Sequence, residues 1–318
     1  MASGILLIDK PADITSFEVV RRARRALRVR KVGHLGTLDP FATGLLPLCC
    51  GEATKLVPFL MPEAKTYLAQ VKLGEETDTQ DFTGEVVARA DSLPPPEAIY
   101  LQAAGFVGEI EQVPPMYSAR HHQGQRLYKL ARRGEVVARP PRKVRVFSLK
   151  VQEVALPSVT IRVACAAGTY IRTLAADLGR ALGCGAHLTG LRRLAVGPFK
   201  VEEAITLEAM TQMTREELAG RLIPLKDCLP GMKAVAVEPD QACSLRQGRP
   251  LPYAQGDLAP EELVRVLLGP ELVAVARVRL VESLTWITPL RVFAQSQPSA
   301  ASSQTGCASD RALLTPDR

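Results

Sequence analysis

Residues 33–47 read GHLGTLDPFATGLLP, and this stretch carries the strongest structural signal in the chain. Three glycines, Gly33, Gly36 and Gly44, permit backbone conformations closed to other residues, and Pro40 fixes the chain directly after Asp39. The pattern predicts a tightly shaped loop that presents one carboxylate. Because Asp before Pro is also an ordinary turn device, Asp39 is a candidate catalytic group with a plain turn residue as the alternative.

Apolar periodicity on the N-terminal side of this loop predicts a strand and then a helix. Residues 5–8, ILLI, form a strand-length buried run, and Thr15 with Glu18 has the spacing of a helix-starting capping box. The buried stripe of this helix is expected to consist of Phe17, Val20, Ala23 and Leu27.

Beyond the loop, strand and helix patterns alternate irregularly. Residues 65–73, KTYLAQVKL, alternate polar and apolar positions, and residues 144–154 and 159–166 indicate a strand pair. From Gly168 to about Gly183 the period becomes helical. The fold class predicted is therefore α+β, with a mixed sheet rather than a doubly wound one.

Turn signals and composition divide the chain into three parts. A large domain is expected at 1–229, with an insertion at about 114–145, and a small β-rich domain at 230–295. Residues 296–318 are rich in Ser, Ala and Gln, and they are expected to form a disordered tail.

Composition excludes several classes of protein. The 318 residues are 47% hydrophobic and 23% charged, as in ordinary globular proteins, and no signal peptide or transmembrane run is evident. The seven scattered cysteines contain no C-x-x-C pair, so reduced thiols, no metal site and a cytoplasmic location are expected. Because Walker, G-x-G-x-x-G, H-E-x-x-H and G-x-S-x-G motifs are also absent, carboxylate chemistry without a cofactor remains.

Basic residues concentrate in two segments of a chain whose net charge is +7. Seven cations fall within residues 21–31, among them Arg21, Arg22 and Arg25, and nine lie within 120–145 against the single acid Glu135. The second group includes Arg120, Arg126, Arg132 and Arg133, interleaved with Tyr and His. Phosphate contact with RNA is favoured over a merely solvated surface.

Five stretches together resemble the bacterial TruB family of tRNA pseudouridine synthases. They are GILLIDKP, the loop GHLGTLDPFATGLLP with GEATK, KTYLAQVKLG with TDTQDFTG, PPMYSARHHQGQRLYKLARRG, and GTYIRTLAADLGRALGCGAHLTGLRRLAVGPF. They occur in family order over residues 4–210. The resemblance implies the pseudouridine synthase fold, with a mainly antiparallel sheet flanked by helices, and a PUA-like RNA-binding domain at the C-terminal end.

The resemblance also implies an activity: isomerisation of uridine 55 in the T arm of tRNA, without metal or cofactor. Asp39 corresponds to the catalytic aspartate, which attacks either the base or the ribose. Tyr67 corresponds to the residue that stacks on the flipped uracil, Arg172 to the partner of the aspartate, and His34 to a wedge in the RNA. The remaining matches near the pocket are Tyr170, Lys10, Lys55 and Leu191. Leu35 departs from the family pattern, which has a small residue or Thr there.

Three hypotheses of function follow from these motifs. A stand-alone, monomeric tRNA enzyme is favoured over a guide-RNA-dependent relative, because the N-terminal extension expected of the guided type is missing. A non-catalytic RNA-binding or folding protein is disfavoured, because Asp39, Tyr67 and Arg172 are present together. No membrane association and no obligate protein partner are expected.

Overall fold

The computed structural model describes residues 2–118, 121–122, 124–131, 133–135, 137–253 and 258–294. Arg120, Arg132 and the tail expected at 296–318 lie outside the described residues, as does the side chain of Arg126. The chain separates into two compact units, and the division falls between Leu222 and Ile223, upstream of the boundary expected after residue 229.

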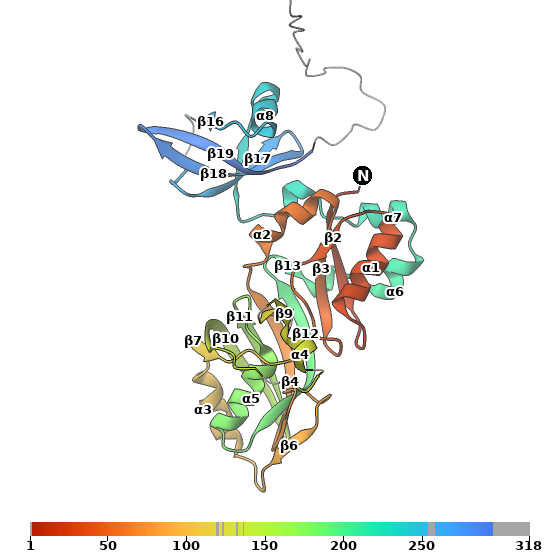
Figure 1. Ribbon diagram of the computed structural model, residues 1–318, viewed down its shortest axis with the longest axis vertical. Coiled ribbons are helices and arrows are strands. Elements are labelled where there is room, and N and C mark those ends of the chain that lie inside the picture. Colours follow the sequence, from red (N-terminus) through yellow and green to blue (C-terminus); the bar gives the residue numbers. More distant parts are fainter. Residues whose placement is uncertain are drawn as a thin grey trace, which may run out of the picture. The chain divides into compact units, whose positions relative to one another are not determined.

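One mixed sheet of ten described strands forms the framework of the first unit (Figure 1). Its strands are β1 (Gly4–Lys10), β2 (Val32–His34), β3 (Thr43–Cys50), β4 (Lys65–Leu73), β7 (Gly108–Gln112), β10 (Arg142–Ala155), β11 (Ser158–Cys165), β12 (Ala186–Val196), β13 (Phe199–Lys200) and β14 (Ile205–Thr206). The main order is β14-β1-β3-β12-β4-β11-β10-β7, with β2 beside β3 and β13 beside β12. Only β1 with β14 and β12 with β3 pair in parallel, so the predicted mixed, mainly antiparallel α+β fold is confirmed.

Two short hairpins and several helices complete the first unit. The hairpins pair β5 (Glu75–Thr77) with β6 (Val86–Arg89) and β8 (His121–His122) with β9 (Gln125–Arg126). The α-helices are α1 (Ser16–Leu27), α2 (Val57–Leu60), α3 (Pro96–Ala104), α4 (Leu127–Ala131), α5 (Ile171–Ala181), α6 (Leu207–Gln212) and α7 (Arg215–Gly220), and the 3-10 helices are η1 (Gly51–Leu56) and η2 (Val201–Glu203).

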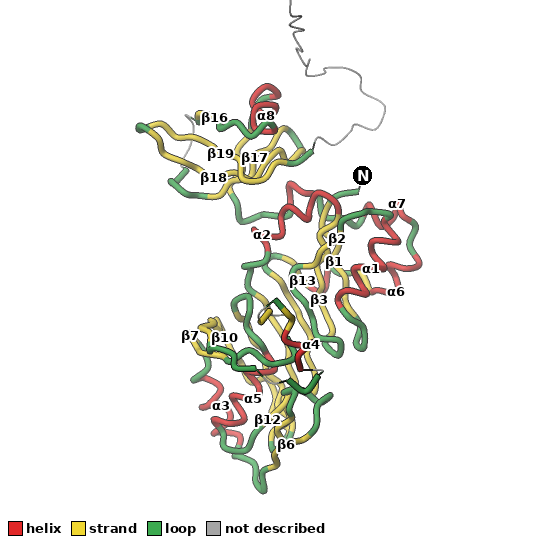
Figure 2. Tube along the Cα trace, viewed as in Figure 1, coloured by secondary structure: helices red, strands yellow, loops and turns green. Residues whose placement is uncertain are grey.

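The helices gather in two groups along the sheet (Figures 1 and 2). α3 contacts α5, which packs on β12 and β4, whereas α1 packs with α6 and α7 near β1. Within the part of the chain that the structure describes, no helix is long and apolar enough to cross a membrane.

The predicted patterns match the buried faces except in α1. The run at 5–8 in β1 is buried, and β4 buries alternate residues from Lys65 to Leu73, as its sequence predicts. Val20, Ala23 and Leu27 are buried in α1, but Phe17 is 69% exposed and Val19 takes its place in the core. The prediction for Phe17 is wrong because a helical stripe allows spacings of both three and four residues. Phe17 lies three residues before Val20, but Val19, four residues before Ala23, is the one on the buried face.

The second unit is built around a five-stranded sheet and one helix among its described residues. Its elements are η3 (Leu225–Asp227), β15 (Lys233–Ala236), α8 (Pro239–Arg246), β16 (Leu251–Pro252), β17 (Leu263–Leu268), β18 (Glu271–Val281) and β19 (Leu284–Val292). The strands lie in the order β15-β17-β18-β19-β16, over a small apolar core that includes Val235, Val266 and Val273. This confirms the predicted β-rich fold at the C-terminal end of the chain.

Candidate active site

The loop between β2 and β3 carries Asp39 and is held at two points by neighbouring elements. Ser16, at the start of α1, accepts a hydrogen bond from the Leu38 amide at 2.9 Å and donates to the Leu38 carbonyl at 3.1 Å. On the other side of Asp39, the Lys10 ammonium donates to the Pro40 carbonyl at 2.9 Å. Hydrogen bonds therefore hold the backbone of both residues that flank Asp39, Leu38 and Pro40.

Lys10 is a fully buried anchor at the end of β1. Besides Pro40, its Nζ donates to the carbonyls of Pro11 and Ile14, each at 2.8 Å. Burial lowers the pKa of Lys10 to about 8, although the carboxylates of Asp13 and Asp39 act in the opposite direction. The structure thus places this predicted site residue beneath the loop, where it contacts three backbone carbonyls.

Two positions of the loop require glycine, because both have a positive φ and because, at one of them, a neighbouring backbone leaves no room for a Cβ atom. Gly44 has a φ of +97°, and a Cβ there would lie 2.3 Å from the Arg193 carbonyl oxygen. Gly36 has a φ of +114°, also in the region that side chains disfavour. Leu35 is fully buried, and its amide donates to the Pro47 carbonyl at 3.1 Å, so the unusual residue faces the core.

Arg172, in the first turn of α5, holds both oxygens of the Asp39 carboxylate along one edge of its guanidinium. Nε lies 3.0 Å from Oδ2 of Asp39, and Nη2 donates to Oδ1 at 3.2 Å. The remaining donors reach the carbonyls of Thr79 at 3.1 Å and Tyr117 at 2.6 Å. The pairing of Asp39 with Arg172 expected from the family resemblance is present in the structure.

The environment of Asp39 raises its pKa above the usual range of an aspartate. Burial is the largest cause and the Asp81 carboxylate adds to it, whereas Arg172 lowers the pKa through its charge and hydrogen bond. The Asp39 side chain still keeps 32% of its surface exposed, which leaves a reactant an approach to the carboxylate.

Asp81 is the second carboxylate on Arg172, and it is not among the residues predicted from the sequence. Its Oδ2 lies 3.4 Å from Nη1 of Arg172, and its Oδ1 accepts bonds from the Thr79 hydroxyl at 2.9 Å and the Thr83 amide at 3.0 Å. These contacts lie within TDTQDFTG, residues 77–84, whose density of Thr, Asp and Gly was the available signal. The loop fixes Arg172 from the side opposite Asp39.

Tyr67 and Arg193 form a buried pair across neighbouring strands. Tyr67 on β4 is 7% exposed and stands opposite Arg193 on β12, and their side chains are hydrogen-bonded. Burial raises the pKa of Tyr67, while the Arg193 charge opposes that change. Arg193 is fully buried and was missed in the sequence, because an arginine in a strand reads as a surface residue.

His34 is held by a local hydrogen bond, and Tyr170 is held by bonds to a residue far away in the chain. Nδ1 of His34 accepts the Gly36 amide at 3.2 Å, and burial lowers the pKa of the ring, so the neutral form donates from Nε2. The backbone of Tyr170, directly before α5, bonds twice to the buried Gln112 side chain, at 3.0 and 3.2 Å. Gln112 is a further positioning group that the sequence pattern did not indicate.

The other predicted residues lie in different surroundings. Leu191 is half-buried on β12 against the core, and Lys55 lies in η1, where it pairs with Glu52 at 2.5 Å. Arg21 and Arg22 both pair with Glu18, at 2.6 and 3.0 Å, so this acid partly offsets the charge of α1. Arg25 is exposed, and the exposed Arg133 pairs with Glu135 at 2.8 Å.

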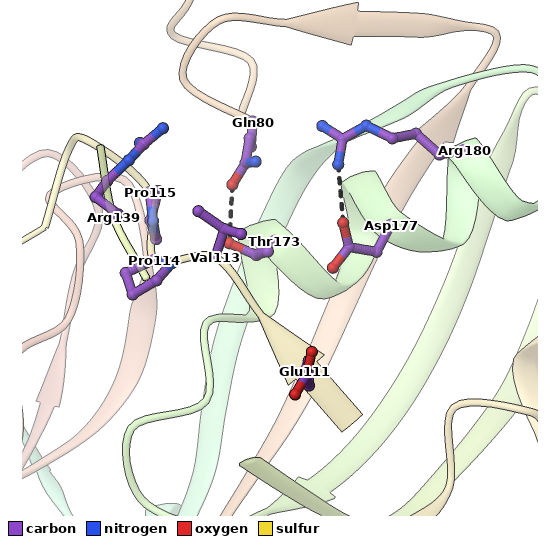
Figure 3. A pocket seen from close by; sticks show the side chains of 9 residues that line it. All are labelled: Gln80, Glu111, Val113, Pro114, Pro115, Arg139, Thr173, Asp177 and Arg180. Carbon is purple, nitrogen blue, oxygen red and sulfur yellow. Dashed lines mark hydrogen bonds and ion pairs between the residues drawn. The ribbon is translucent and has the colours of Figure 1, made fainter. Parts of the chain in front are cut away.

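A pocket of about 370 Å³ lies beside α5 (Figure 3). It is lined by Gln80, Glu111, Val113, Pro114, Pro115, Arg139, Thr173, Asp177 and Arg180. The Thr173 hydroxyl donates to Gln80 at 2.9 Å, and Arg180 donates to Asp177 at 2.8 Å. None of the predicted catalytic or substrate-binding residues is among these lining residues, but Gln80 and Thr173 directly adjoin Asp81 and Arg172 in the chain.

Comparisons with known proteins agree with this geometry. A model of the N-terminal domain of TruB family pseudouridylate synthases matches residues 24–171, and one of the tRNA pseudouridylate synthase B C-terminal domain matches residues 172–233. Tyr170 and Arg172 thus lie at the junction of the two matches. These two matches, which together cover residues 24–233, define a pseudouridylate synthase.

Proteins of similar sequence and structure indicate the family of pseudouridylate synthases to which the chain belongs. The tRNA pseudouridine synthase B of Cupriavidus pinatubonensis is 46% identical over 87% of this chain and 90% of its own length, and that of Geobacter sulfurreducens is 47% identical over 78% and 82%. A chain of an H/ACA RNP bound to a substrate RNA containing 2'-deoxyuridine superimposes with a TM-score of 0.70 at 26% identity, covering 92% of this chain and 85% of that one. The chain belongs to the TruB family.

Proposed function

We propose that the protein isomerises uridine 55 in the T arm of tRNA to pseudouridine. The observation that carries the proposal is the Asp39 carboxylate, which is partly exposed in a fixed loop and whose two oxygens are held by Arg172. Relatives at 45–47% identity are named tRNA pseudouridine synthase B, which supports tRNA uridine as the substrate.

The reaction exchanges one bond between the base and the ribose without redox change. The bond from N1 of uracil to C1′ of the ribose breaks, the base rotates, and a bond from C5 to C1′ forms. N1 gains a proton and C5 loses one, so atoms and charge balance. Asp39 would act as the nucleophile, either on the uracil ring or on C1′, and its ionised form is the reactive one.

Access to the base requires its extrusion from the folded RNA, which costs a few kcal/mol of stacking. Tyr67 offers an aromatic face for the extruded uracil, and His34 is assigned the wedge that enters the RNA. Tyr170 and Leu191 are assigned to the walls of the pocket, Lys10 to the support of the loop, and Lys55 to a peripheral contact.

Tyr67→Ala is expected to weaken capture of the flipped base by about 1 to 3 kcal/mol, because one base stacked on an aromatic ring is worth that much. Tyr67→Phe retains the ring and is expected to keep most of the binding. Titration of a T-arm stem-loop against each variant measures the effect. Equal affinity and turnover in Tyr67→Ala and wild type would make Tyr67 a purely structural residue of β4.

The salt dependence of RNA binding tests the proposed phosphate contacts of α1 and of the sequence segment 120–145, which includes Arg120, Arg126, Arg132 and Arg133. Each phosphate contact that is lost should reduce the slope of log K against log salt by about 0.7 to 0.9. Arg25→Ala, at an exposed position of α1, is expected to do so. The matched control is Arg89→Ala, because Arg89 is exposed but paired with Glu75 at 3.5 Å. Identical slopes for Arg25→Ala and wild type would remove α1 from the RNA interface.

The proposal includes action without a guide RNA or an obligate protein partner, as a monomer in the cytoplasm. Sequence identity favours this over the guide-dependent alternative, since the H/ACA and Cbf5 chains are only 25–28% identical to this one. The second unit, assigned as PUA-like, would add an RNA contact. A non-catalytic role is less well supported, because the Asp39–Arg172 pair is intact.

The direct experiment is to incubate the purified full chain alone with unmodified tRNA transcript and map pseudouridine at every uridine. Pseudouridine at position 55 without added RNA or protein is the expected result. Formation only after a guide RNA is added would favour the alternative, and formation at another uridine would refute the assigned position.

A further inference from the structure

Arg193 lies on β12, the strand between β3 and β4. On β12 it stands opposite Gly44 of β3 on one side and opposite Tyr67 of β4 on the other. Residues directly opposite in an antiparallel pair project from the same face of the sheet, which is why Arg193 and Tyr67 meet. β3 follows directly from the loop that presents Asp39.

The Arg193 guanidinium has three bonding partners, and each belongs to this region. Nε donates to the Leu45 carbonyl at 2.7 Å, Nη2 donates to the Gly36 carbonyl at 3.0 Å, and the Tyr67 hydroxyl is the third partner. Because a guanidinium only donates, the Tyr67 oxygen must accept this bond, which leaves the hydroxyl hydrogen of Tyr67 free to donate elsewhere.

The burial of Arg193 is unusual for a residue with a structural role alone. Its side chain is 0% exposed, and its hydrogen bonds go to carbonyl oxygens and to Tyr67 rather than to a carboxylate. A buried charge without an opposite partner destabilises a fold, and an apolar side chain of similar volume would avoid that cost. The presence of a cation here instead points to a role for its hydrogen-bond donors.

We propose that Arg193 is a positioning residue that fixes the Tyr67 hydroxyl and the Gly36 turn of the Asp39 loop in one rigid arrangement. The ring that receives the uracil and the loop that presents the nucleophile are then held by the same guanidinium. Displacement of either by a fraction of an ångström is enough to slow a reaction that depends on alignment. This inference rests on the proposed function of the site.

A double-mutant cycle between Arg193→Lys and Tyr67→Phe tests the coupling. With saturating enzyme and a T-arm stem-loop, Arg193→Lys alone is expected to lower the single-turnover rate about tenfold or more, with RNA affinity within about threefold of wild type. In the Tyr67→Phe background the same substitution should lower the rate by a clearly smaller factor, because only the contacts with the Asp39 loop and β3 remain to be lost. Equal factors in the two backgrounds would overturn the proposal.

The matched control is Arg192→Lys on the adjacent position of β12. Arg192 is 39% exposed and pairs with Asp9 at 2.7 Å, so its rate should stay near wild type. Where Arg193→Lys does not fold, Arg193→Gln, which keeps planar donors without charge, takes its place in the cycle. If neither folds while Arg192→Lys does, Arg193 serves the fold and the proposal fails. An active wild type in that case leaves the proposed function standing.

Discussion

Asp39→Asn is expected to reduce pseudouridine formation by about 10⁴-fold or more, because the amide retains the shape of the side chain but is not a nucleophile. The fold should survive, since Arg172 keeps its bonds to the Thr79 and Tyr117 carbonyls and its contact with Asp81. Ser16 and Lys10 hydrogen-bond to the backbone of the loop, so the substitution does not remove these bonds. RNA affinity should therefore remain close to wild type.

Single-turnover assays with saturating enzyme separate chemistry from binding, because excess enzyme rescues only a binding defect. The melting temperature is measured in parallel to verify the fold. Asp13→Asn is the matched control: Asp13 is exposed in the same region and has a φ of +60°, which asparagine adopts readily. Pseudouridine forming in Asp39→Asn at a rate near that of wild type would refute the assigned mechanism.

Arg172→Lys is expected to move the acid limb of the pH–rate profile to higher pH. The pKa of Asp39 is already raised by burial and by Asp81, and the charge and hydrogen bond of Arg172 act against that rise. Lysine keeps the charge but loses the bidentate contact with both carboxylate oxygens, so less of the Asp39 carboxylate is ionised at a given pH. The rate of the variant should fall most at low pH and approach wild type as the pH rises.

Arg172→Met tests how much Arg172 contributes to the free energy of unfolding. Removing the cation leaves Asp39 and Asp81 without their shared partner, and loss of one member of a buried ion pair costs about 3 to 5 kcal/mol. Arg180→Lys on the same helix is the control, since Arg180 is 51% exposed and pairs with Asp177. Superimposable pH profiles for Arg172→Lys and wild type would show that Arg172 does not tune Asp39.

Sequence alone was sufficient for the features that depend on neighbouring residues. The alternation in β4, the apolar run of β1 and the helical period of α5 each follow from spacing along the chain, and all three elements form where expected. The loop at 33–47 likewise follows from its own glycines and proline, but the catalytic role predicted for Asp39 came from the family resemblance.

Tertiary structure decided which side chains meet that loop. Arg172 lies 133 positions from Asp39 and 93 from Thr79, and its pairing with Asp39 was predicted only through the family resemblance. The family resemblance assigned no role to three further residues. In the sequence, Asp81 has the pattern of a turn residue, Gln112 that of a strand end and Arg193 that of a surface cation. Burial and hydrogen bonding assign them other roles once the sheet places β12 between β3 and β4. Periodicity identifies the buried face of an element, but only packing against distant strands determines which polar side chains are enclosed there, because the cost of burial depends on partners far away in the chain.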